Sequence, residues 1–393
     1  MNRFPSSGMI ALMAPAPLYD LSSSVGPEMD LSMLSSLDQA GLSYGTVEGE
    51  PLLRARIAEL SGVAPDDVLV TVGGMHSLFL LAFAVCRQAT EVVLTTPVFP
   101  PFRDVLTALE ARVVEHRLSF DQGYTLDVAG LRTRLSADTK LVCLASPQNP
   151  SGVGHTVAEL EEVLRLMEEI CPNAYLLVDE TYREGFYGDE AASCGATIAN
   201  RVVTVASLSK CHGAPGLRLG WIITKDRELY SQLALGKFNT VLSCSSLDEA
   251  LGLQLLTDHQ AILAERRPVL RTGLSAIARW IEKNEDYVEW VKPSAGTVCC
   301  VRLRPEVFDQ CAVNRFYASL SDKSIRLAPG GWFGEEDRVF RLGFAAMPYE
   351  LFEKGLDALE EAILSAASIA DRQRGAYGRC DRCKCKSGCA AAK

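Results

Sequence analysis

The stretch Ser207-Leu208-Ser209-Lys210-Cys211-His212-Gly213-Ala214-Pro215-Gly216-Leu217-Arg218-Leu219-Gly220-Trp221 follows an apolar, β-rich run of the chain. A lysine at the end of such a strand, before a glycine-rich loop, lies where an α/β sheet presents its ligands. A desolvated lysine near other cations has a lowered pKa and becomes a nucleophile toward carbonyl groups. A lone lysine of this kind is more often a surface residue in a loop, so the rest of the chain must decide.

Short apolar runs rich in β-branched residues alternate with helical patterns, such as the amphipathic stretch 157–170. This alternation predicts an α/β fold, in which a mostly parallel sheet is covered by helices on both faces. The runs expected to form strands are residues 68–72, 91–95, 112–116, 140–145, 175–178, 201–206 and 219–224.

The later part of the chain has a different pattern. Residues 247–285 predict long helix with a break or kink at Pro268. Shorter runs then alternate with helical segments at 307–321 and 349–367, which is typical of a small α+β domain. These runs are residues 288–291, 298–303, 325–328 and 339–344. We expect a large domain over 46–275, a small domain from 1–45 and 276–370, and a cysteine-rich basic tail at 371–393.

Composition excludes several classes of protein. The net charge of -10 argues against nucleic-acid binding, which needs a basic face. Residues 68–86 carry no charge, but the helical part of this stretch is too short to cross a membrane. Several of the thirteen cysteines lie in apolar runs, and residues 1–13 lack a convincing signal peptide. Both observations favour a reducing, cytoplasmic location.

The pattern Ser-x-x-Lys-x-x-Gly-x-x-Gly-x-Arg-x-Gly over 207–220 resembles the class I/II aminotransferases of fold type I, which depend on pyridoxal 5′-phosphate (PLP). Further matching motifs run in the family's order from about Tyr44 to Arg341. The resemblance implies that Lys210 holds PLP as a Schiff base. It also implies a large seven-stranded, mostly parallel sheet with a small α+β domain beside it.

The phosphate of PLP needs a site for a dianion. The glycine pair before Met75 follows a strand and opens a helix, so its backbone N–H groups and the helix dipole suit an anion. By the resemblance, Gly74, Met75 and His76 form the phosphate-binding loop. Ser207 and Arg218 resemble the family's side-chain ligands of the phosphate, and an arginine supplies a permanently charged fork.

The pyridine nitrogen must stay protonated so that the ring can act as an electron sink. Asp179 ends an apolar strand and matches the family's partner of this nitrogen. Tyr182 and Asn149 match the donors to the phenolic oxygen. A flat aromatic side chain over the ring would fix its plane by stacking. The resemblance nominates Phe99 for this position, with Phe102 as the competing choice.

The α-carboxylate of a substrate needs a cationic anchor. Arg341 matches the family's carboxylate-binding arginine, and Asn149 is expected in the same substrate site. A bidentate guanidinium–carboxylate pair would orient Cα over the cofactor. Tyr44 resembles the tyrosine that reaches the phosphate of a partner subunit, which implies a homodimer with shared active sites. Ser245 or Ser246 is a further candidate for reaching across.

Two features depart from the family's pattern. His76 and His212 are not the usual residues at their positions, and each is either a neutral packing residue, which we favour, or a site-specific acid or base. The tail has the spacing C-x2-C-x-C-x3-C, which is either a disordered, redox-sensitive extension, the interpretation we favour, or a site for zinc or a soft ion. Its four cysteines are Cys380, Cys383, Cys385 and Cys389.

The expected reaction is transamination between an α-amino acid and an α-keto acid. The segment from Ala328 to Arg341 also resembles capreomycidine synthase-like enzymes, so elimination or cyclisation on the same cofactor is the alternative. A third hypothesis is a PLP-binding regulatory protein without turnover, but the sequence shows no DNA-binding module. Side-chain specificity is expected to depend on residues 20–30, 241–246 and 328–334.

Overall fold

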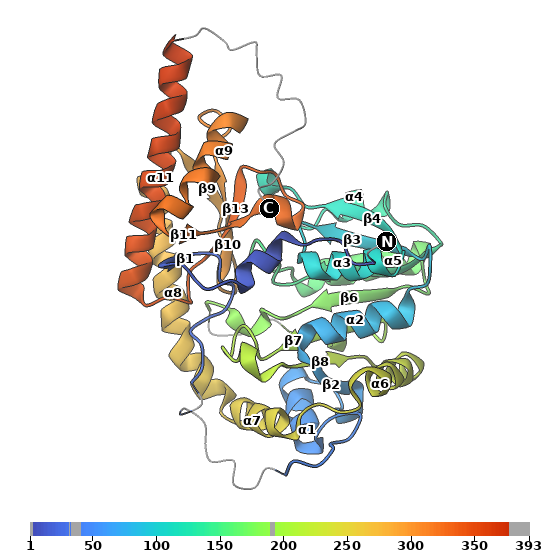
Figure 1. Cartoon of the computed structure of the whole chain (residues 1–393). Helices are drawn as coiled ribbons and strands as arrows, with labels where there is room; N and C mark the ends of the chain where they lie inside the picture. Colours follow the sequence, from blue (N-terminus) through green and yellow to red (C-terminus); the bar gives the residue numbers. More distant parts are fainter. Residues whose placement is uncertain (1–2, 31, 33–40, 189–192, 377–393) are drawn as a thin grey trace.

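The computed structural model describes residues 3–30, 32, 41–188 and 193–376. A seven-stranded sheet with the order β2-β8-β7-β6-β5-β3-β4 forms its centre (Figure 1). The strands are β2 (Val68–Val72), β3 (Glu91–Thr96), β4 (Arg112–Arg117), β5 (Thr139–Ala145), β6 (Tyr175–Asp179), β7 (Val202–Ser207) and β8 (Leu219–Ile223). Strand β8 is antiparallel to β2 and β7, and the remaining neighbours pair in parallel. The predicted α/β fold is therefore confirmed, with each strand within one residue of its expected bounds.

Helices cover both faces of this sheet (Figure 1). Along β5, Leu141 and Cys143 join the core under one face, whereas Val142 and Leu144 join the core under the other. This alternation follows from the two-residue period of a strand. One core includes helices α2 (Gly73–Val85), α3 (Pro100–Ala108) and α6 (Arg227–Val241), and the other includes α4 (Val128–Arg132) and α5 (Val157–Ile170). Helices α1 (Pro51–Ser61) and α7 (Ser246–Thr257) pack near β2 and β8.

Local sequence explains where α5 begins. The Thr156 hydroxyl accepts a hydrogen bond from the backbone N–H of Glu159 at 3.2 Å, and the Glu159 carboxylate accepts one from the backbone N–H of Thr156 at 2.6 Å. This reciprocal capping box satisfies two N–H groups that the first turn of the helix leaves without partners.

A second, antiparallel sheet has the order β12-β13-β10-β9. Its strands are β9 (Val288–Val291), β10 (Val298–Leu303), β12 (Ala328–Pro329) and β13 (Val339–Gly343). Helices α8 (His259–Lys283), α9 (Gln310–Ser319) and α11 (Tyr349–Ala376) share an apolar core with it. Strand β1 (Tyr19–Asp20) pairs in parallel with β11 (Ile325–Arg326), and Leu21 joins the same core. The first residues of the chain therefore pack with its last helix.

The remaining elements are short. They are the helix α10 (Gly330–Phe333) and the 3-10 turns η1 (Gly8–Met13), η3 (Pro65–Asp67), η4 (Phe120–Gln122), η5 (Arg183–Gly185), η6 (Gly195–Thr197), η7 (Pro215–Leu217) and η8 (Ser321–Lys323). Within the described ranges, no helix is long and apolar enough to cross a membrane.

Two sequence predictions about elements are wrong in detail. The helix break lies at Asp258, between α7 and α8, and Pro268 lies inside α8. A proline removes one helical N–H, and here the helix continues through it, with Leu263 and Leu270 buried on either side. The run 325–328 forms two short strands that belong to different sheets.

Candidate active site

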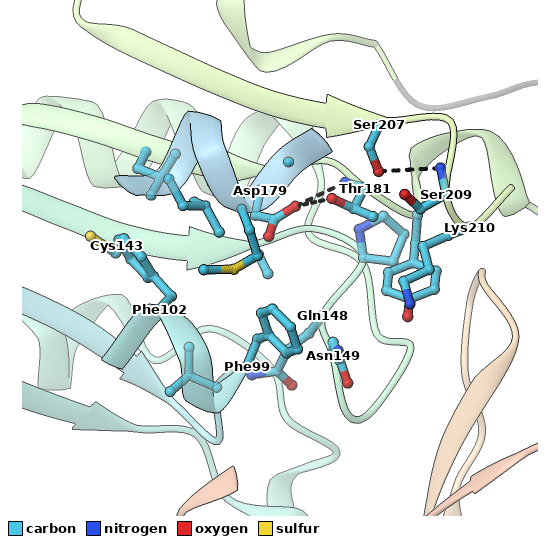
Figure 2. A pocket seen from close by; sticks show the side chains of 18 of the residues that line it. Phe99, Phe102, Cys143, Gln148, Asn149, Asp179, Thr181, Ser207, Ser209 and Lys210 are labelled. Carbon is cyan, nitrogen blue, oxygen red and sulfur yellow. Dashed lines mark hydrogen bonds between the residues drawn. The ribbon is translucent and has the colours of Figure 1, made fainter. Parts of the chain in front are cut away.

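A cavity of about 670 Å³ lies at the carboxyl ends of β5, β6 and β7 (Figure 2). This is the edge where open α/β sheets bind their ligands, and the volume suits a small molecule. Most of the predicted site residues line it, although they come from separate parts of the sequence. They are Gly74, Met75, Phe99, Asn149, Asp179, Tyr182, Ser207, Lys210 and Arg218.

Lys210 follows the end of β7 and lines the cavity. Burial lowers the pKa of its ε-amine to about 8, and the positive charges of Arg341 and Arg218 act in the same direction, whereas Asp179 opposes them. The Lys210 Nζ donates a hydrogen bond to the Ser24 hydroxyl at 2.9 Å. Near neutral pH, an amine with this lowered pKa is present as the neutral nucleophile that attacks carbonyl groups in a far larger fraction than an ordinary lysine.

Asp179 ends β6 and lines the same cavity. Its carboxylate accepts hydrogen bonds from the Thr181 backbone N–H at 3.0 Å and from the Thr181 hydroxyl at 2.6 Å (Figure 2). Burial raises the pKa of Asp179, while the bonds from Thr181 and the charge of Lys210 partly offset this. A buried, well-oriented carboxylate of this kind stabilises a cationic nitrogen placed against it.

The first turn of α2 and Arg218 form a second corner of the cavity. Gly73 has a φ of +72°, and a Cβ there would lie 2.6 Å from Arg218 Nη2. Only glycine therefore lets the guanidinium lie so close to the start of this helix. Ser207 lies close to the start of α2 as well, because a Cβ on Gly74 would lie 3.8 Å from the Ser207 Cβ. A helix N-terminus, a guanidinium and a hydroxyl together suit an anion such as phosphate.

The His76 side chain does not line this cavity. Its Nδ1 accepts a hydrogen bond from the Val72 backbone N–H at 3.3 Å, and its Nε2 lies 3.0 Å from the Thr240 hydroxyl. Burial, with the charge of Lys237, lowers the pKa of His76 to about 4. These contacts fit a neutral, packed His76 side chain. At this end of the cavity, an anion would meet the backbone at the start of α2 instead of the imidazole.

Arg341 lies in β13 and is buried, with 1% of its surface exposed. It does not line the cavity, but its Nη1 donates to the Asn149 Oδ1 at 2.9 Å, and Asn149 does line it. Its Nη2 donates to the Ser22 carbonyl at 2.7 Å. Its Nε is buried without a hydrogen-bond partner among the described residues. The structure thus joins the two residues predicted for the substrate carboxylate.

Four further candidates differ in their surroundings. Phe99 and Phe102 both line the cavity, and Figure 2 shows Phe99 on the side of Asn149. Tyr44 is 86% exposed and lies outside the cavity of its own chain. Tyr182 lines the cavity, and its hydroxyl donates to the Ser24 carbonyl at 3.2 Å.

His212 is buried and lies outside the cavity lining. Its Nε2 lies 3.0 Å from the His259 Nδ1, and His259 in turn pairs with Glu184 at 3.5 Å. Burial, with the charge of His259, lowers the pKa of His212 to about 3. A neutral, packed imidazole fits these contacts.

Sequence reasoning missed Thr181, Ser209, Gln148 and Ser24. Thr181 could have been found, because an Asp-x-Thr spacing lets the hydroxyl reach the carboxylate two residues earlier. Ser209 and Gln148 line the cavity without a pattern of their own. Ser24 comes from a segment with no periodic pattern, so no local signal could have linked it to Lys210.

The site defines a class of protein: an α/β enzyme in which a buried lysine, a carboxylate and an anion site surround one cavity. The family model of the class I and II aminotransferases matches residues 10–359, so the chain belongs to this family. The chain is therefore a PLP-dependent aminotransferase of class I/II.

Individual proteins with established names are similar to the chain. The chain is 29% identical over 342 residues to capreomycidine synthase of Streptomyces vinaceus, covering 86% of this chain and 85% of that protein. It is 27% identical over 352 residues to aspartate aminotransferase of Rhizobium meliloti, covering 84% and 82%. A crystal structure of a PLP-dependent aminotransferase from Streptococcus suis superimposes with a TM-score of 0.84 at 24% identity, covering 93% of this chain and 99% of that one. The last comparison supports the fold that was predicted.

Within the described part of the chain, no group of three or more His, Cys, Asp or Glu side chains is placed to hold a metal ion. The tail cysteines lie outside the described residues, so the predicted alternatives for them stay predictions. These cysteines are Cys380, Cys383, Cys385 and Cys389.

Proposed function

We propose that this site moves an amino group from an α-amino acid to an α-keto acid and that Lys210 carries the chemistry. The observation on which this rests is the buried ε-amine with its lowered pKa in the same cavity as Asp179 and Arg218. Such an amine attacks a carbonyl carbon and, once released, can take up a proton.

The donors of the cavity fit PLP. The start of α2, with Ser207 and Arg218, would hold the phosphate, and Gly73 leaves the space that Arg218 needs. Asp179 would hold the ring nitrogen, Phe99 would lie against the ring face, and the residues at the phenolic oxygen would be Asn149 and Tyr182. When bound, PLP supplies a sink for the electron pair left at the substrate Cα.

The remaining work falls to side chains of this protein. Arg341 would bind the substrate α-carboxylate, and its bond to Asn149 links that anchor to the cavity wall. The carboxylate would fix Cα within reach of the Lys210 amine, which takes the Cα proton. A general base held in this way contributes roughly 10²–10⁴-fold to the rate. Thr181 keeps the Asp179 carboxylate oriented throughout.

Elimination or cyclisation is the second candidate, because the chain is similar to capreomycidine synthase along most of its length. The same lysine, carboxylate and arginine would serve that reaction. The difference would lie in a leaving group on the substrate side chain and in how the cavity orients it.

A half-reaction assay separates the two. Purified holoenzyme is mixed with each common amino acid, and with arginine derivatives, without a keto acid. Transamination predicts conversion of the cofactor to pyridoxamine phosphate with one equivalent of keto acid. Loss of a side-chain group with an unchanged cofactor spectrum would overturn the proposal in favour of the second candidate.

We also propose a homodimer with shared sites. Tyr44 is exposed, as are several apolar side chains of α6, and the segment before it contacts the start of α7, where the Ser246 hydroxyl donates to the Gly41 carbonyl at 2.6 Å. Exposed apolar surfaces of this kind mark protein–protein contacts. The exposed apolar residues of these two segments are Leu42, Tyr44, Leu235, Phe238, Val241 and Leu242.

A complementation experiment tests the shared sites. Lys210→Ala and Tyr44→Ala proteins, each of low activity, are unfolded, mixed and refolded. A shared site predicts that mixed dimers regain activity, because one of their two sites contains both native residues. Monomers in sedimentation, or no gain on mixing, would contradict the proposal.

We infer a division of the chain near residues 45 and 275. The apolar core around the second sheet is formed by Leu21 and by buried side chains that lie between Leu270 and Ala367 in the sequence. The large domain would be 46–275 and the small one 1–45 with 276–370. A cytoplasmic location is supported by buried cysteines that carry thiols, among them Cys143 and Cys299.

A further inference from the structure

An irregular segment near the start of the chain, residues 21–29, follows β1 and is hydrogen-bonded to residues of the site. Its backbone is held from both sides. The Leu21 and Ser22 carbonyls accept hydrogen bonds from the Gly343 N–H at 2.7 Å and from Arg341 at 2.7 Å. At the other end, the Met29 N–H donates to the Gly213 carbonyl at 2.7 Å. The segment is therefore fixed to the loop that carries Lys210.

Ser24 lies in the middle of this segment, and its carbonyl has two donors. The Tyr182 hydroxyl donates to it at 3.2 Å and the Thr297 hydroxyl at 2.9 Å. These bonds come from different parts of the fold and fix the backbone at Ser24. The position of the Ser24 side chain is then set before any ligand enters.

The Ser24 hydroxyl is aimed at the reactive amine. It accepts a hydrogen bond from Lys210 Nζ at 2.9 Å, and among the described residues it is the one hydrogen-bond partner of that atom. A lysine side chain has a flexible four-carbon stem, so a free amine without a partner explores several positions. A hydroxyl can both accept from and donate to an amine, and so it can hold the charged and the neutral form.

We propose that Ser24 is a positioning residue for Lys210. It holds the ε-amine whenever that amine is not bonded to the cofactor, and so keeps it in place for proton transfer at the substrate Cα. This inference rests on the proposed role of Lys210. It adds that a residue far away in sequence sets the position of the base.

The test compares Ser24→Ala with Ser24→Thr, which keeps a hydroxyl, and with Ser23→Ala. Ser23 is a matched control, because its hydroxyl accepts from the Val25 N–H at 3.4 Å instead of from the lysine. For each holoenzyme, borohydride reduction followed by peptide mapping first establishes that Lys210 carries the cofactor. If the reduced cofactor is not found on Lys210, the proposed role of Lys210 is wrong. The contact between Ser24 and Lys210 is then tested separately by acetic anhydride labelling.

The first readout is the primary isotope effect with a Cα-deuterated amino acid. In Ser24→Ala we expect kcat to fall about tenfold and the isotope effect to rise, because a poorly held base slows proton transfer. KM should change little. Ser24→Thr should retain most of the activity, and Ser23→Ala should match the native enzyme.

The second readout is the pH dependence of acetic anhydride labelling of Lys210 in the pyridoxamine form, in which the amine is free. A hydroxyl acceptor stabilises the ammonium form more than the amine, so Ser24→Ala should lower the half-labelling pH by about one unit. A loss of activity with both readouts unchanged would show that Ser24 is merely structural, and the proposal would be wrong. Unchanged activity with both readouts unchanged would equally overturn it.

Discussion

The carboxyl edge of the seven-stranded sheet lines the cavity, whereas the irregular segment 21–29 lies outside the lining and is joined to residues of the site by hydrogen bonds. The sheet edge supplies side chains, Asp179 directly after β6 and Lys210 shortly after β7. The segment supplies mainly backbone carbonyls, at Ser22, Ser24 and Pro27. The contribution of the sheet edge thus depends on which side chains it carries. The contribution of the segment depends mostly on the path of its backbone, which places the carbonyl groups.

This difference predicts different sensitivities to substitution. Replacing a side chain at the sheet edge removes a chemical group from the cavity. Carbonyls of the segment survive any substitution, so this region is weakened by removing the groups that hold it. The comparison can be tested from both sides.

Lys210→Ala should have the largest effect. It removes the proposed base and the bond to the cofactor, so activity should fall by at least roughly 10²–10⁴-fold. The native protein should show an absorbance band that borohydride bleaches, and the variant should lack an internal linkage. If the Lys210→Ala protein still shows an internal bond to the cofactor that borohydride reduces, Lys210 is not the residue that holds the cofactor.

The ionisation of Lys210 gives the next effect. Burial lowers its pKa from 10.5 to about 8, so the ammonium form dominates below that pH and the neutral amine accumulates as the pH rises through it. The rate at which PLP bonds to cofactor-free protein, followed by absorbance, should rise about fifty-fold between about pH 6 and pH 8. Above pH 8 the rate should rise only about twofold further, and a rise of nearly tenfold per pH unit up to about pH 10 would show an ordinary lysine.

Arg341→Lys tests the residue that contacts both regions, since it binds Asn149 at the sheet edge and Ser22 in the segment. A lysine keeps the charge but loses the planar fork. We expect KM for the amino acid to rise about ten- to thirty-fold with a smaller change in kcat, measured by steady-state kinetics. Arg338→Lys, whose Nε donates to the Phe308 carbonyl, is the control and should leave KM unchanged.

Arg266→Met should have the smallest effect on catalysis. Arg266 of α8 donates to the Pro27 carbonyl, and its loss leaves that carbonyl without this partner. The free energy of unfolding should fall by about 1–3 kcal/mol. Hydrogen exchange at the Met29 N–H should speed up, while activity falls less than tenfold.

The control on the same helix is Lys283→Met, because Lys283 forms only an exposed ion pair with Glu360. Such a pair contributes at most about 1 kcal/mol, and exchange at Met29 should stay as in the native protein. If Arg266→Met has no effect on Met29, the segment does not depend on this contact.

The sequence was sufficient for the sheet and for the residues at its edge, because apolar runs mark strands and chemical groups directly follow them. The positions of Lys210 and Asp179 after apolar strands could be predicted in this way, whereas their roles, like those of Asn149 and Arg218, came from the family resemblance. The contact of Ser24 with Lys210 was not predictable, because it depends on a tertiary path through a segment without periodicity. The break at Asp258 was missed because the prediction relied on the proline signal, whereas Pro268 lies inside α8.

The direction of β8 has a mechanical consequence for Lys210. Because β8 returns antiparallel beside β7, the Leu208 N–H bonds to the Leu219 carbonyl at 3.1 Å and closes the loop between them. Both ends of that loop are thus fastened to the same rigid sheet. If a covalent bond forms and breaks at Nζ in every turnover, the movement would be taken up by the torsions of the lysine side chain, because the two ends of the loop are tied to the sheet.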